Sequence, residues 1–369
     1  MDSQFIPVSD HNPISEISWA DPQRAQVFKQ WLAPLAGQFG IEPQSLRPAS
    51  VDASFRRYFR LSSSLPENPT LIVMDAPPQQ EDCRPFVHVD QLMKAAGLRV
   101  PDILDWDEAN GFMLLSDLGN QTVLETVNAG TPNMALAHQL LTQACDILVR
   151  WQLASQPGTL PVFDETLLRR DLNLFPEWYV AQYRQMPLTP EQQKVLAHSF
   201  DLIIQRNLAS ASVYMHRDYM PRNLMVGGTL PNGQTAELGV LDFQDAVYGP
   251  ISYDIASLMR DAFHSWEEEF VLDITIRYWE MARKAGLPVP ADFSEFWVAV
   301  EWMGLQRHLK ILGIFARLTL RDGKPKYLAD TPRFINYVRA TCARYRELAP
   351  LLKLVDQIEN ITPQFGYTF

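Results

Sequence analysis

The pattern of apolar residues changes type near Gly119, and this change limits the possible folds more than any other feature of the chain. The segments before it have the short apolar runs and turn-forming spacers that are typical of strands, with one amphipathic helix among them. The predicted strands are residues 54–63, 70–77, 101–107 and 111–119, and the predicted helix is residues 82–97. The later segments have apolar residues at helical spacing, over residues 133–155, 191–210, 252–283, 293–320 and 334–354. The sequence therefore predicts an α+β fold with two lobes, a small β-rich lobe and a larger helical one.

Two segments do not follow this simple division. Residues 1–20 are polar without a sustained period and predict a loose arm, whereas residues 21–40 predict a helix with Asp21 as its N-cap before Pro22. Within the helical half, the insert at residues 212–246 has strand-like runs around the turn-forming stretch GGTLPNGQ, which predicts a hairpin. We expect residues 116–119 to connect the lobes, so that one domain spans residues 1–118 and the other residues 119–369.

The composition excludes several classes of protein. The chain has 369 residues, of which 47% are hydrophobic, so it contains enough apolar material for a buried core and is not disordered. A net charge of −11 argues against a general nucleic-acid binder, although it leaves room for a local basic pocket that binds an anion. No uncharged apolar run approaches the roughly 20 residues that span a bilayer, so we expect no membrane partner.

The cysteines and the N-terminal residues indicate where the protein works. Cys83, Cys145 and Cys342 are far apart and fit neither a metal site nor a disulfide framework, which favours a reducing compartment. The first residues lack the cationic and apolar segments of a signal peptide. We therefore expect a cytoplasmic protein, and we expect it to be a monomer.

The hairpin insert carries the residues with the most specific chemistry. Its segment HRDYMPRN, residues 216–223, fits the pattern H-R-D-x-x-x-x-N of kinase catalytic loops, and a strand-like run downstream ends at Asp242. Phosphoryl transfer needs a carboxylate that orients or deprotonates the acceptor hydroxyl, and oxygen ligands for Mg²⁺. We predict that Asp218 is the base, that Asn223 and Asp242 hold Mg²⁺ with bound ATP, and that His216 is a structural residue of the loop. The alternative is an ordinary polar loop, which the downstream strand and the order of the lobes disfavour.

Together with VLDFQDAVYGPISYDIASLMRD, this loop resembles the aminoglycoside phosphotransferase and related small-molecule kinase family, which has a protein-kinase-like fold. The resemblance implies that Asp254 braces the catalytic loop. It also makes Asp245 an alternative metal-associated carboxylate, because the chain has D-F-Q-D where the family has D-W-D. An enzyme of EC 2.7.1 type that uses ATP and Mg²⁺ is the activity that this resemblance implies.

Other segments resemble one branch of that family, the bacterial kinases that phosphorylate the anomeric hydroxyl of N-acetylmuramate and N-acetylglucosamine. These segments are ASFRRYFRL, LIVMDAPPQQEDCRPF, MLLSDLG and RRDLNLFPEWY, and the likeness runs from about Ala53 to Leu320. It implies a sugar 1-phosphate product that feeds peptidoglycan recycling and UDP-sugar synthesis. Two alternatives stay open: a kinase of another hydroxylated molecule such as an aminoglycoside, choline or homoserine, and a pseudokinase that only binds nucleotide or sugar.

The chain departs from the usual kinase pattern where the nucleotide phosphates would bind. Met74 occupies the third-strand position at which a kinase has lysine, and no glycine-rich loop is present. We expect the turn that contains Ser54 and Phe55 to cover the phosphates, and Arg56 or Arg57 to supply the missing cation. The alternative for the two arginines is a solvated strand face.

The remaining predicted contacts are to adenine and to the acceptor. Backbone groups of Ser116 and Leu118 are predicted to hydrogen-bond adenine, and Ile72 and Leu241 to sandwich it, although these two side chains also suit the core. Polar and aromatic residues in two segments, 169–179 and 301–310, are predicted to bind the acceptor, the alternative being solvated helix faces. The predicted acceptor residues are Arg170, Asp171, Glu177, Trp178 and Arg307. With Lys310, the arginines favour a neutral or anionic sugar over a cationic antibiotic.

Overall fold

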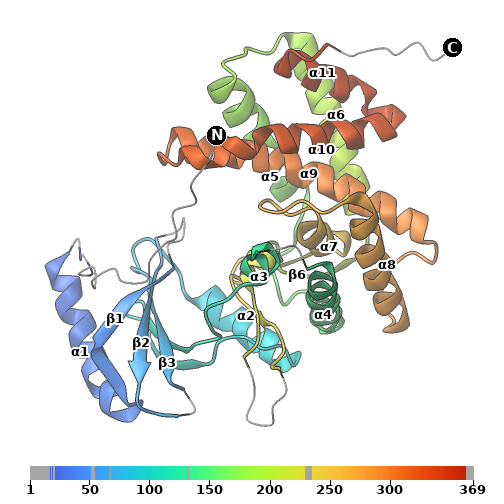
Figure 1. The fold of residues 1–369 in the computed structure, drawn as a ribbon. Coiled ribbons are helices and arrows are strands. Elements are labelled where there is room, and N and C mark those ends of the chain that lie inside the picture. The colour runs from blue at the N-terminus through green and yellow to red at the C-terminus, as the bar shows by residue number, and fades with distance from the viewer. Residues whose placement is uncertain are drawn as a thin grey trace, which may run out of the picture. The chain divides into compact units, whose positions relative to one another are not determined.

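The computed structural model describes residues 17, 19, 21–50, 55–66, 68–130, 133–228 and 235–362, which form two compact units (Figure 1). The first unit contains the residues up to Gln91 and the segment Val100–Asn120, and the second contains Leu92–Arg99 and the residues from Gln121 onward. Ser54 and most of the predicted N-terminal arm lie outside the described residues.

The first unit is built on a five-stranded antiparallel sheet with the strand order β1-β2-β3-β5-β4. Its elements are α1 (Pro22–Gln38), β1 (Ile41–Ser50), β2 (Arg57–Ser63), β3 (Thr70–Asp75), β4 (Ile103–Asp107) and β5 (Phe112–Ser116), with α2 (Arg84–Ala95) running on into the second unit. The N–H of Gln23 donates to the Asp21 side chain over 2.8 Å, which is the cap expected from the sequence.

Helix α1 packs against one face of this sheet, beside β1 in Figure 1, and the core of the unit lies between them. The core contains Phe28, Leu32, Leu35, Ile41, Phe59, Leu61, Leu71, Val73, Phe112 and Leu114. Because side chains alternate along a strand, the residues between these on β2 and β3 belong to the opposite face. Ile72 and Met74 therefore belong to the face that α1 does not cover.

Strand β1 was not predicted from the sequence. Its segment IEPQSLRPAS contains two prolines and no alternating apolar pattern, so it lacks the usual strand signal. The strand forms because it lies at the sheet edge, where proline is tolerated, and its register with β2 is irregular after Glu42 and again after Pro48.

The second unit is mostly helical, and α9 (Phe293–Leu320), a helix of 28 residues, is at its centre. Helix α9 contacts α5, α6, α7, α10 and the π-helix η1, and Figure 1 shows α10 running alongside it. The helices are α3 (Val123–Asn128), α4 (Met134–Leu153), α5 (Glu165–Leu174), η1 (Phe175–Tyr183), α6 (Pro190–Leu208), α7 (Ser252–Met259), α8 (Glu268–Lys284), α10 (Thr331–Arg344) and α11 (Ala349–Glu359), with short 3₁₀ turns η2 (Pro221–Asn223), η3 (Pro325–Asp330) and η4 (Arg346–Leu348).

The prediction of one helix over residues 252–283 was wrong, because the chain leaves the helix after Met259 and resumes at Glu268. The Asp261 side chain accepts the N–H groups of Phe263 and His264 over 3.1 and 3.0 Å. An aspartate side chain that accepts hydrogen bonds from nearby backbone N–H groups competes with the hydrogen bonds of the helix and ends it. The predicted helix over residues 334–354 is divided in the same way, into α10 and α11.

Two short strand pairs lie among these helices. Strand β6 (Ser212–Met215) pairs with β9 (Val247–Pro250), and β7 (Leu224–Met225) pairs with β8 (Gly239–Val240), both antiparallel. The predicted hairpin is therefore present, although residues 229–234 of its turn lie outside the described residues. These pairs hold both ends of the segment HRDYMPRN in place.

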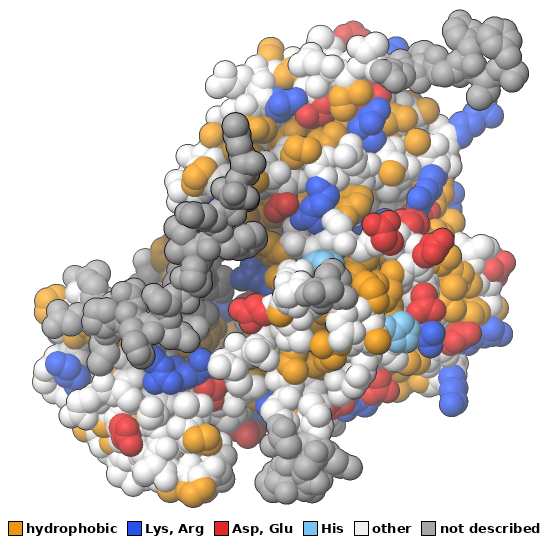
Figure 2. Space-filling view, in the orientation of Figure 1, with side chains coloured by type: hydrophobic (Ala, Val, Ile, Leu, Met, Phe, Trp, Pro, Cys, Tyr) orange, Lys and Arg blue, Asp and Glu red, His pale blue; other side chains and the backbone are white. Residues whose placement is uncertain are grey.

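The face shown in Figure 2 carries Lys and Arg side chains interspersed with Asp and Glu side chains. None of the helices in the described part of the chain has both the length and the apolar character needed to cross a membrane.

Candidate active site

The two residues predicted to hold Mg²⁺ meet beside the β7–β8 pair. The N–H of Leu241 donates to the carbonyl of Asn223 over 2.9 Å and extends the ladder, so that Asp242 lies next to Asn223. Asn223 donates from Nδ2 to Oδ2 of Asp242 over 3.2 Å, and Gln244 donates from Nε2 to Oδ1 of Asp242 over 2.9 Å. An amide and a carboxylate are thus brought together, and their oxygens are ligands that Mg²⁺ prefers.

The predicted base, Asp218, is fixed through its backbone. Its N–H donates to Nδ1 of His216 over 3.2 Å, and its carbonyl accepts a hydrogen bond from Nδ2 of Asn223 over 2.8 Å. Within the described part of the chain, no donor makes a hydrogen bond to the half-buried Asp218 carboxylate. A carboxylate with open lone pairs on a rigid backbone is suited to accept a hydrogen bond from an acceptor hydroxyl.

The hydrogen bonds of His216 fix its tautomer. Because Nδ1 accepts the N–H of Asp218, the proton of the neutral ring is on Nε2, which donates to the carbonyl of Leu241 over 3.0 Å. Complete burial lowers the pKa of His216 to about 4, although the nearby Asp218 charge acts in the opposite direction. The ring is therefore neutral near pH 7 and links the loop to the residue that precedes Asp242.

Asp254 lies beneath the same loop, on α7. Its two carboxylate oxygens accept the N–H groups of His216 and Arg217 over 2.7 and 3.0 Å. Burial raises the pKa of Asp254 to about 7, and these two N–H groups limit the rise because they stabilise the ionised form. The carboxylate thereby holds Arg217 in a left-handed backbone conformation, with φ of +74°.

Three cations and one carboxylate lie beside the loop. We call Arg217, Arg307 and Lys310 the cationic cluster. Nζ of Lys310 is 2.9 Å from Oδ2 of the buried Asp171, Nη2 of Arg217 is 3.9 Å from the same oxygen, and Arg307 donates to the carbonyl of Arg217 over 3.2 Å. Burial acts to lower the pKa of Lys310, but Tyr253 and Asp171 outweigh burial and raise it, so the ammonium stays charged.

A close helix crossing brings Asp171 and Lys310 together. A Cβ on Gly313 of α9 would lie 2.3 Å from the backbone carbonyl of Leu174 on α5, so only glycine permits this approach. Gly313 is three residues after Lys310, and Leu174 is three residues after Asp171, so each pair shares one helix face. The contact between the two helices therefore sets the distance between the ammonium and the carboxylate.

The other predicted acceptor residues are placed differently. Arg170 is 64% exposed, and its guanidinium is 4.0 Å from Oδ1 of Asp171. Glu177 is exposed and Trp178 is half-buried, both on η1, and among the described residues no hydrogen bond or ion pair connects them to the catalytic loop. Arg307 is only 4% exposed and braces the loop backbone.

From the sequence, no role was predicted for Arg217, and Lys310 was expected only to be a nearby cation. The sequence HRDYMPRN does not indicate that the backbone of Arg217 is left-handed, because arginine is not typical of that conformation. Only the hydrogen bonds to Asp254 and the crossing of α5 with α9 reveal that these two cations lie beside Asp218.

In the first unit, the two candidate arginines have different partners. Arg57 lies on the α1 side, where it pairs with the completely buried Asp75 and stacks on Trp19, with its guanidinium 4.4 Å from the ring centre. Arg24 of α1 binds the other oxygen of Asp75 over 2.8 Å. Arg57 is thereby committed to the packing of α1 against the sheet.

Arg56 immediately precedes β2 and pairs with Glu81 over 3.1 Å. Its neighbour Phe55 is 63% exposed and donates its N–H to Glu81 over 3.3 Å. Met74, at the position where lysine was expected, is completely buried. Arg56 is two residues before Tyr58, the residue of β2 that pairs with Met74.

The residues predicted to contact adenine are partly engaged within the protein. The N–H of Ser116 donates to the carbonyl of Asp102 over 2.9 Å, so an adenine contact at Ser116 has to use its carbonyl. Leu118 is buried, whereas Ile72 and Leu241 are each half-buried and keep some accessible apolar surface.

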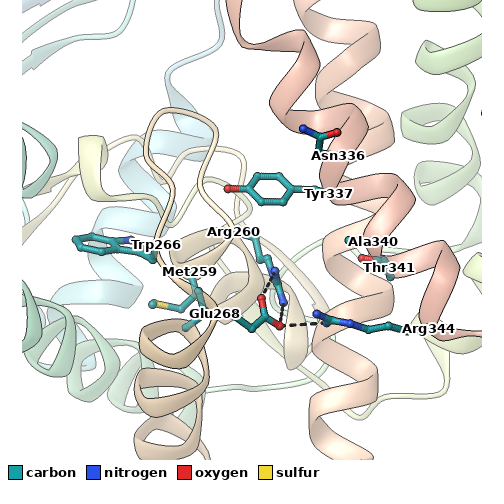
Figure 3. A pocket seen from close by; sticks show the side chains of 10 residues that line it. Met259, Arg260, Trp266, Glu268, Asn336, Tyr337, Ala340, Thr341 and Arg344 are labelled. Carbon is teal, nitrogen blue, oxygen red and sulfur yellow. Dashed lines mark hydrogen bonds and ion pairs between the residues drawn. The ribbon is translucent and has the colours of Figure 1, made fainter. Parts of the chain in front are cut away.

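A separate cavity of about 240 Å³ lies between the end of α7, the start of α8 and α10 (Figure 3). Glu268 bridges Arg260 and Arg344 over 3.2 and 3.1 Å. Burial acts to raise the pKa of Glu268, but the two arginines outweigh burial and lower it. These charges satisfy one another, and no predicted acceptor residue lines the cavity, so we do not assign the acceptor to it.

Comparison with known proteins identifies the family. Residues 45–292 match the sequence profile of the Phosphotransferase enzyme family, abbreviated APH. The N-acetylmuramate/N-acetylglucosamine kinase of Pseudomonas aeruginosa is 48% identical, over 86% of this chain and 90% of that protein. The protein with the same name in Neisseria meningitidis is 46% identical, over 94% of this chain and all of that protein.

Solved structures show the same fold at low sequence identity. The choline kinase LicA from Streptococcus pneumoniae has a TM-score of 0.59 at 13% identity, over 88% of this chain and 100% of that one. The ADP-bound aminoglycoside phosphotransferase APH(2'')-Ib has a TM-score of 0.55 at 14% identity, over 86% of this chain and 97% of that one. The predicted fold class and family resemblance are confirmed, and the chain belongs to the Phosphotransferase enzyme family as a small-molecule kinase with a protein-kinase-like fold.

Proposed function

We propose that this kinase transfers the γ-phosphoryl group of ATP to the C1 hydroxyl of N-acetylmuramate and N-acetylglucosamine. The observation that carries the chemistry is the open carboxylate of Asp218, fixed beside the Asn223–Asp242 pair. The choice of sugar rests on the relatives with 44–48% identity, whose names state both substrates. A cytoplasmic location, with a product that feeds UDP-sugar synthesis and peptidoglycan recycling, is part of this proposal.

Asp218 would accept a hydrogen bond from the C1 hydroxyl and take up its proton as the new O–P bond forms. The anomeric hydroxyl is more acidic than an ordinary alcohol, so a carboxylate of ordinary basicity is sufficient. The backbone bonds of Asp218 to His216 and Asn223 restrict its position, which aids in-line attack on the γ-phosphorus.

The donor set of Asn223 and Asp242 fits Mg²⁺. Among the described residues, no group of three or more His, Cys, Asp or Glu side chains could form a metal site made by the protein alone. Mg²⁺ usually takes one or two protein carboxylates or amides and completes its coordination with water and nucleotide phosphates. When bound, the ion would neutralise charge that develops on the transferred phosphoryl group.

Of the acceptor residues predicted from the sequence, Asp171, Glu177 and Trp178 keep their proposed roles, and Arg307 is given a different one. Asp171 is close to the loop and could accept sugar hydroxyls, and Trp178 and Glu177 on η1 are available for a ring face and a hydroxyl. Arg307 mainly supports the loop, so its effect on the sugar would be indirect.

The direct test measures ATP consumption with Mg²⁺ against N-acetylmuramate, N-acetylglucosamine, glucosamine, kanamycin, choline and homoserine. We expect turnover of the two N-acetyl sugars only, and phosphorus NMR should place the phosphate on C1. Turnover of kanamycin, choline or homoserine in place of the sugars would contradict the proposed substrate class. Phosphate at C6 of either sugar would contradict the proposed acceptor atom.

Met74 occupies the third-strand position at which kinases have a lysine that contacts the nucleotide phosphates. We propose that Arg56 replaces this lysine, because Arg56 is two residues before Tyr58, the strand partner of Met74, and forms an ion pair with Glu81. Arg56→Ala should raise the KM for ATP by roughly 10-fold or more, as expected for the loss of one charge-assisted contact with phosphate, and should change the melting temperature little.

Arg57→Ala is the matched control. It leaves the buried Asp75 with Arg24 as its one remaining ion-pair partner among the described residues, so it should lower the melting temperature by several degrees, corresponding to roughly 1–3 kcal/mol, with a smaller effect on the KM for ATP. The opposite result, a nucleotide defect in Arg57→Ala and a stability defect in Arg56→Ala, would reverse the two assignments.

A further inference from the structure

Arg217 has a backbone conformation that its own side chain disfavours. Its φ of +74° is in the left-handed region, which glycine adopts freely and other residues adopt with strain. The loop requires this conformation because the N–H groups of His216 and Arg217 both donate to Asp254. Glycine would meet that requirement without strain, so the arginine side chain calls for a reason beyond the loop geometry. Strained residues of this kind cluster at functional sites.

The other two members of the cationic cluster are engaged within the protein. Lys310 is 2.9 Å from Oδ2 of Asp171. Arg307 donates to the carbonyl of Arg217 over 3.2 Å, and its Nε, like that of Arg217, has no hydrogen-bond partner among the described residues. Lys310 is therefore matched to a carboxylate, and Arg307 is bound to the backbone of the loop.

Arg217 is not matched in this way. Its contact with Asp171 is a distance of 3.9 Å to an oxygen that Lys310 already binds, and its Nε has no hydrogen-bond partner among the described residues. The side chain is only 15% exposed, and its guanidinium lies 5.8 Å from the ring centre of Phe163. A guanidinium has five N–H donors, so Arg217 keeps donors for a ligand in a partly desolvated position.

We propose that Arg217 binds the carboxylate of an anionic acceptor, which under the proposed function is the lactyl group of N-acetylmuramate. This inference rests on the proposed function and adds the residue that distinguishes its two sugars. Both sugars have the C1 hydroxyl and the N-acetyl group, but only N-acetylmuramate carries a carboxylate, through the ether at C3. Arg217 immediately precedes Asp218, and C3 is two ring atoms from C1, so one bound sugar can reach both residues.

The chemistry of the pair supports a specificity role rather than a general one. Guanidinium and carboxylate form two parallel hydrogen bonds with charge assistance, and such a pair is stronger where water is partly excluded. N-acetylglucosamine has only a hydroxyl at C3 and would leave the Arg217 guanidinium to water, which its partial exposure permits. Arg217 therefore favours one sugar without excluding the other.

The test compares Arg217→Gly with wild type on both sugars. Glycine suits the left-handed backbone, so the variant should fold, and the KM for N-acetylmuramate should rise by roughly 10- to 100-fold. The KM for N-acetylglucosamine should rise much less, so that the preference for N-acetylmuramate, taken as the ratio of the two kcat/KM values, should fall by roughly 10-fold or more. Arg217→Lys keeps the charge but loses the paired geometry, so its KM for N-acetylmuramate should be intermediate.

Gln185→Gly is the matched control, because Gln185 also has a left-handed backbone, with φ of +51°, and follows η1 away from the catalytic loop. It should leave both KM values unchanged. Equal losses on the two sugars in Arg217→Gly, or no loss on either, would overturn the inference while wild-type turnover still supports the proposed function. Wild-type enzyme that phosphorylates neither sugar would refute the proposed function and this inference with it.

If Arg217→Gly melts well below wild type, Arg217→Lys alone decides the question. A rise in the KM for N-acetylmuramate without a comparable rise for N-acetylglucosamine supports the inference. A parallel rise for both sugars refutes it.

Discussion

Replacing Asp218 by asparagine should lower kcat for the accepted sugar by roughly 10²- to 10⁴-fold, the range that a positioned general base contributes. Asparagine has nearly the same shape, but its amide cannot take up the proton of the C1 hydroxyl. The affinity for ATP should stay close to that of wild type, because the proposed role of Asp218 is toward the acceptor. A coupled assay for ADP gives kcat, and a fluorescence titration with ATP gives the dissociation constant.

The fold should tolerate this change because the protein uses only the backbone of Asp218. Its N–H and carbonyl keep their bonds to His216 and Asn223 whatever the side chain, so the melting temperature should be unchanged. A kcat within tenfold of wild type would remove Asp218 from the role of base. If the affinity for ATP falls by as much as kcat, Asp218 acts in nucleotide binding instead.

His216 should not rescue the variant. Its Nδ1 lone pair accepts the N–H of residue 218, and its Nε2 proton is held by the carbonyl of Leu241. The folded-state pKa is about 4, below the usual value, so the ring is neutral above roughly pH 5 and gains its proton only below that. Any acid limb in the activity of wild type between pH 5.5 and 7 should therefore come from a group other than His216.

The sequence allowed the fold class to be predicted because both lobes have their own periodicity. Residues 293–320, for example, form α9 over the predicted range, since the apolar positions repeat at helical spacing along the whole segment. The misses have local causes. Strand β1 contains Pro43 and Pro48 and lacks alternation, and the break after Met259 depends on the hydrogen bonds of Asp261, which the apolar pattern does not show.

The candidate site was predictable to the extent that it is one continuous segment. Asp218 and Asn223 belong to HRDYMPRN, and Asp242 ends the next strand, so a hairpin was enough to bring them together. Lys310 meets Asp171 only through the crossing of α9 with α5 at Gly313, and Arg217 reaches the same carboxylate from the loop, which the apolar pattern of the sequence does not show. Contacts made by distant helices are therefore the part that needed a structure.

Replacing Asp242 by asparagine should lower kcat by roughly 10³-fold or more, because a carboxylate that neutralises the metal ion is lost and several kcal/mol of charge stabilisation depend on that ion. Asparagine tolerates the left-handed backbone at this position, where φ is +63°, so the effect should be chemical rather than conformational. The apparent Mg²⁺ concentration for half-maximal activity should rise. Initial rates across a Mg²⁺ series at saturating ATP measure both quantities.

The neighbouring carboxylate provides the comparison that decides which residue holds the metal. Asp242 is contacted by the amides of Asn223 and Gln244, which orient its two oxygens, whereas Asp245 is exposed. Asp245→Asn should therefore shift the Mg²⁺ dependence much less than Asp242→Asn. A larger shift in Asp245→Asn would indicate that Asp245 binds the metal. The hydrogen bonds from Asn223 and Gln244 to Asp242 would then only stabilise the loop.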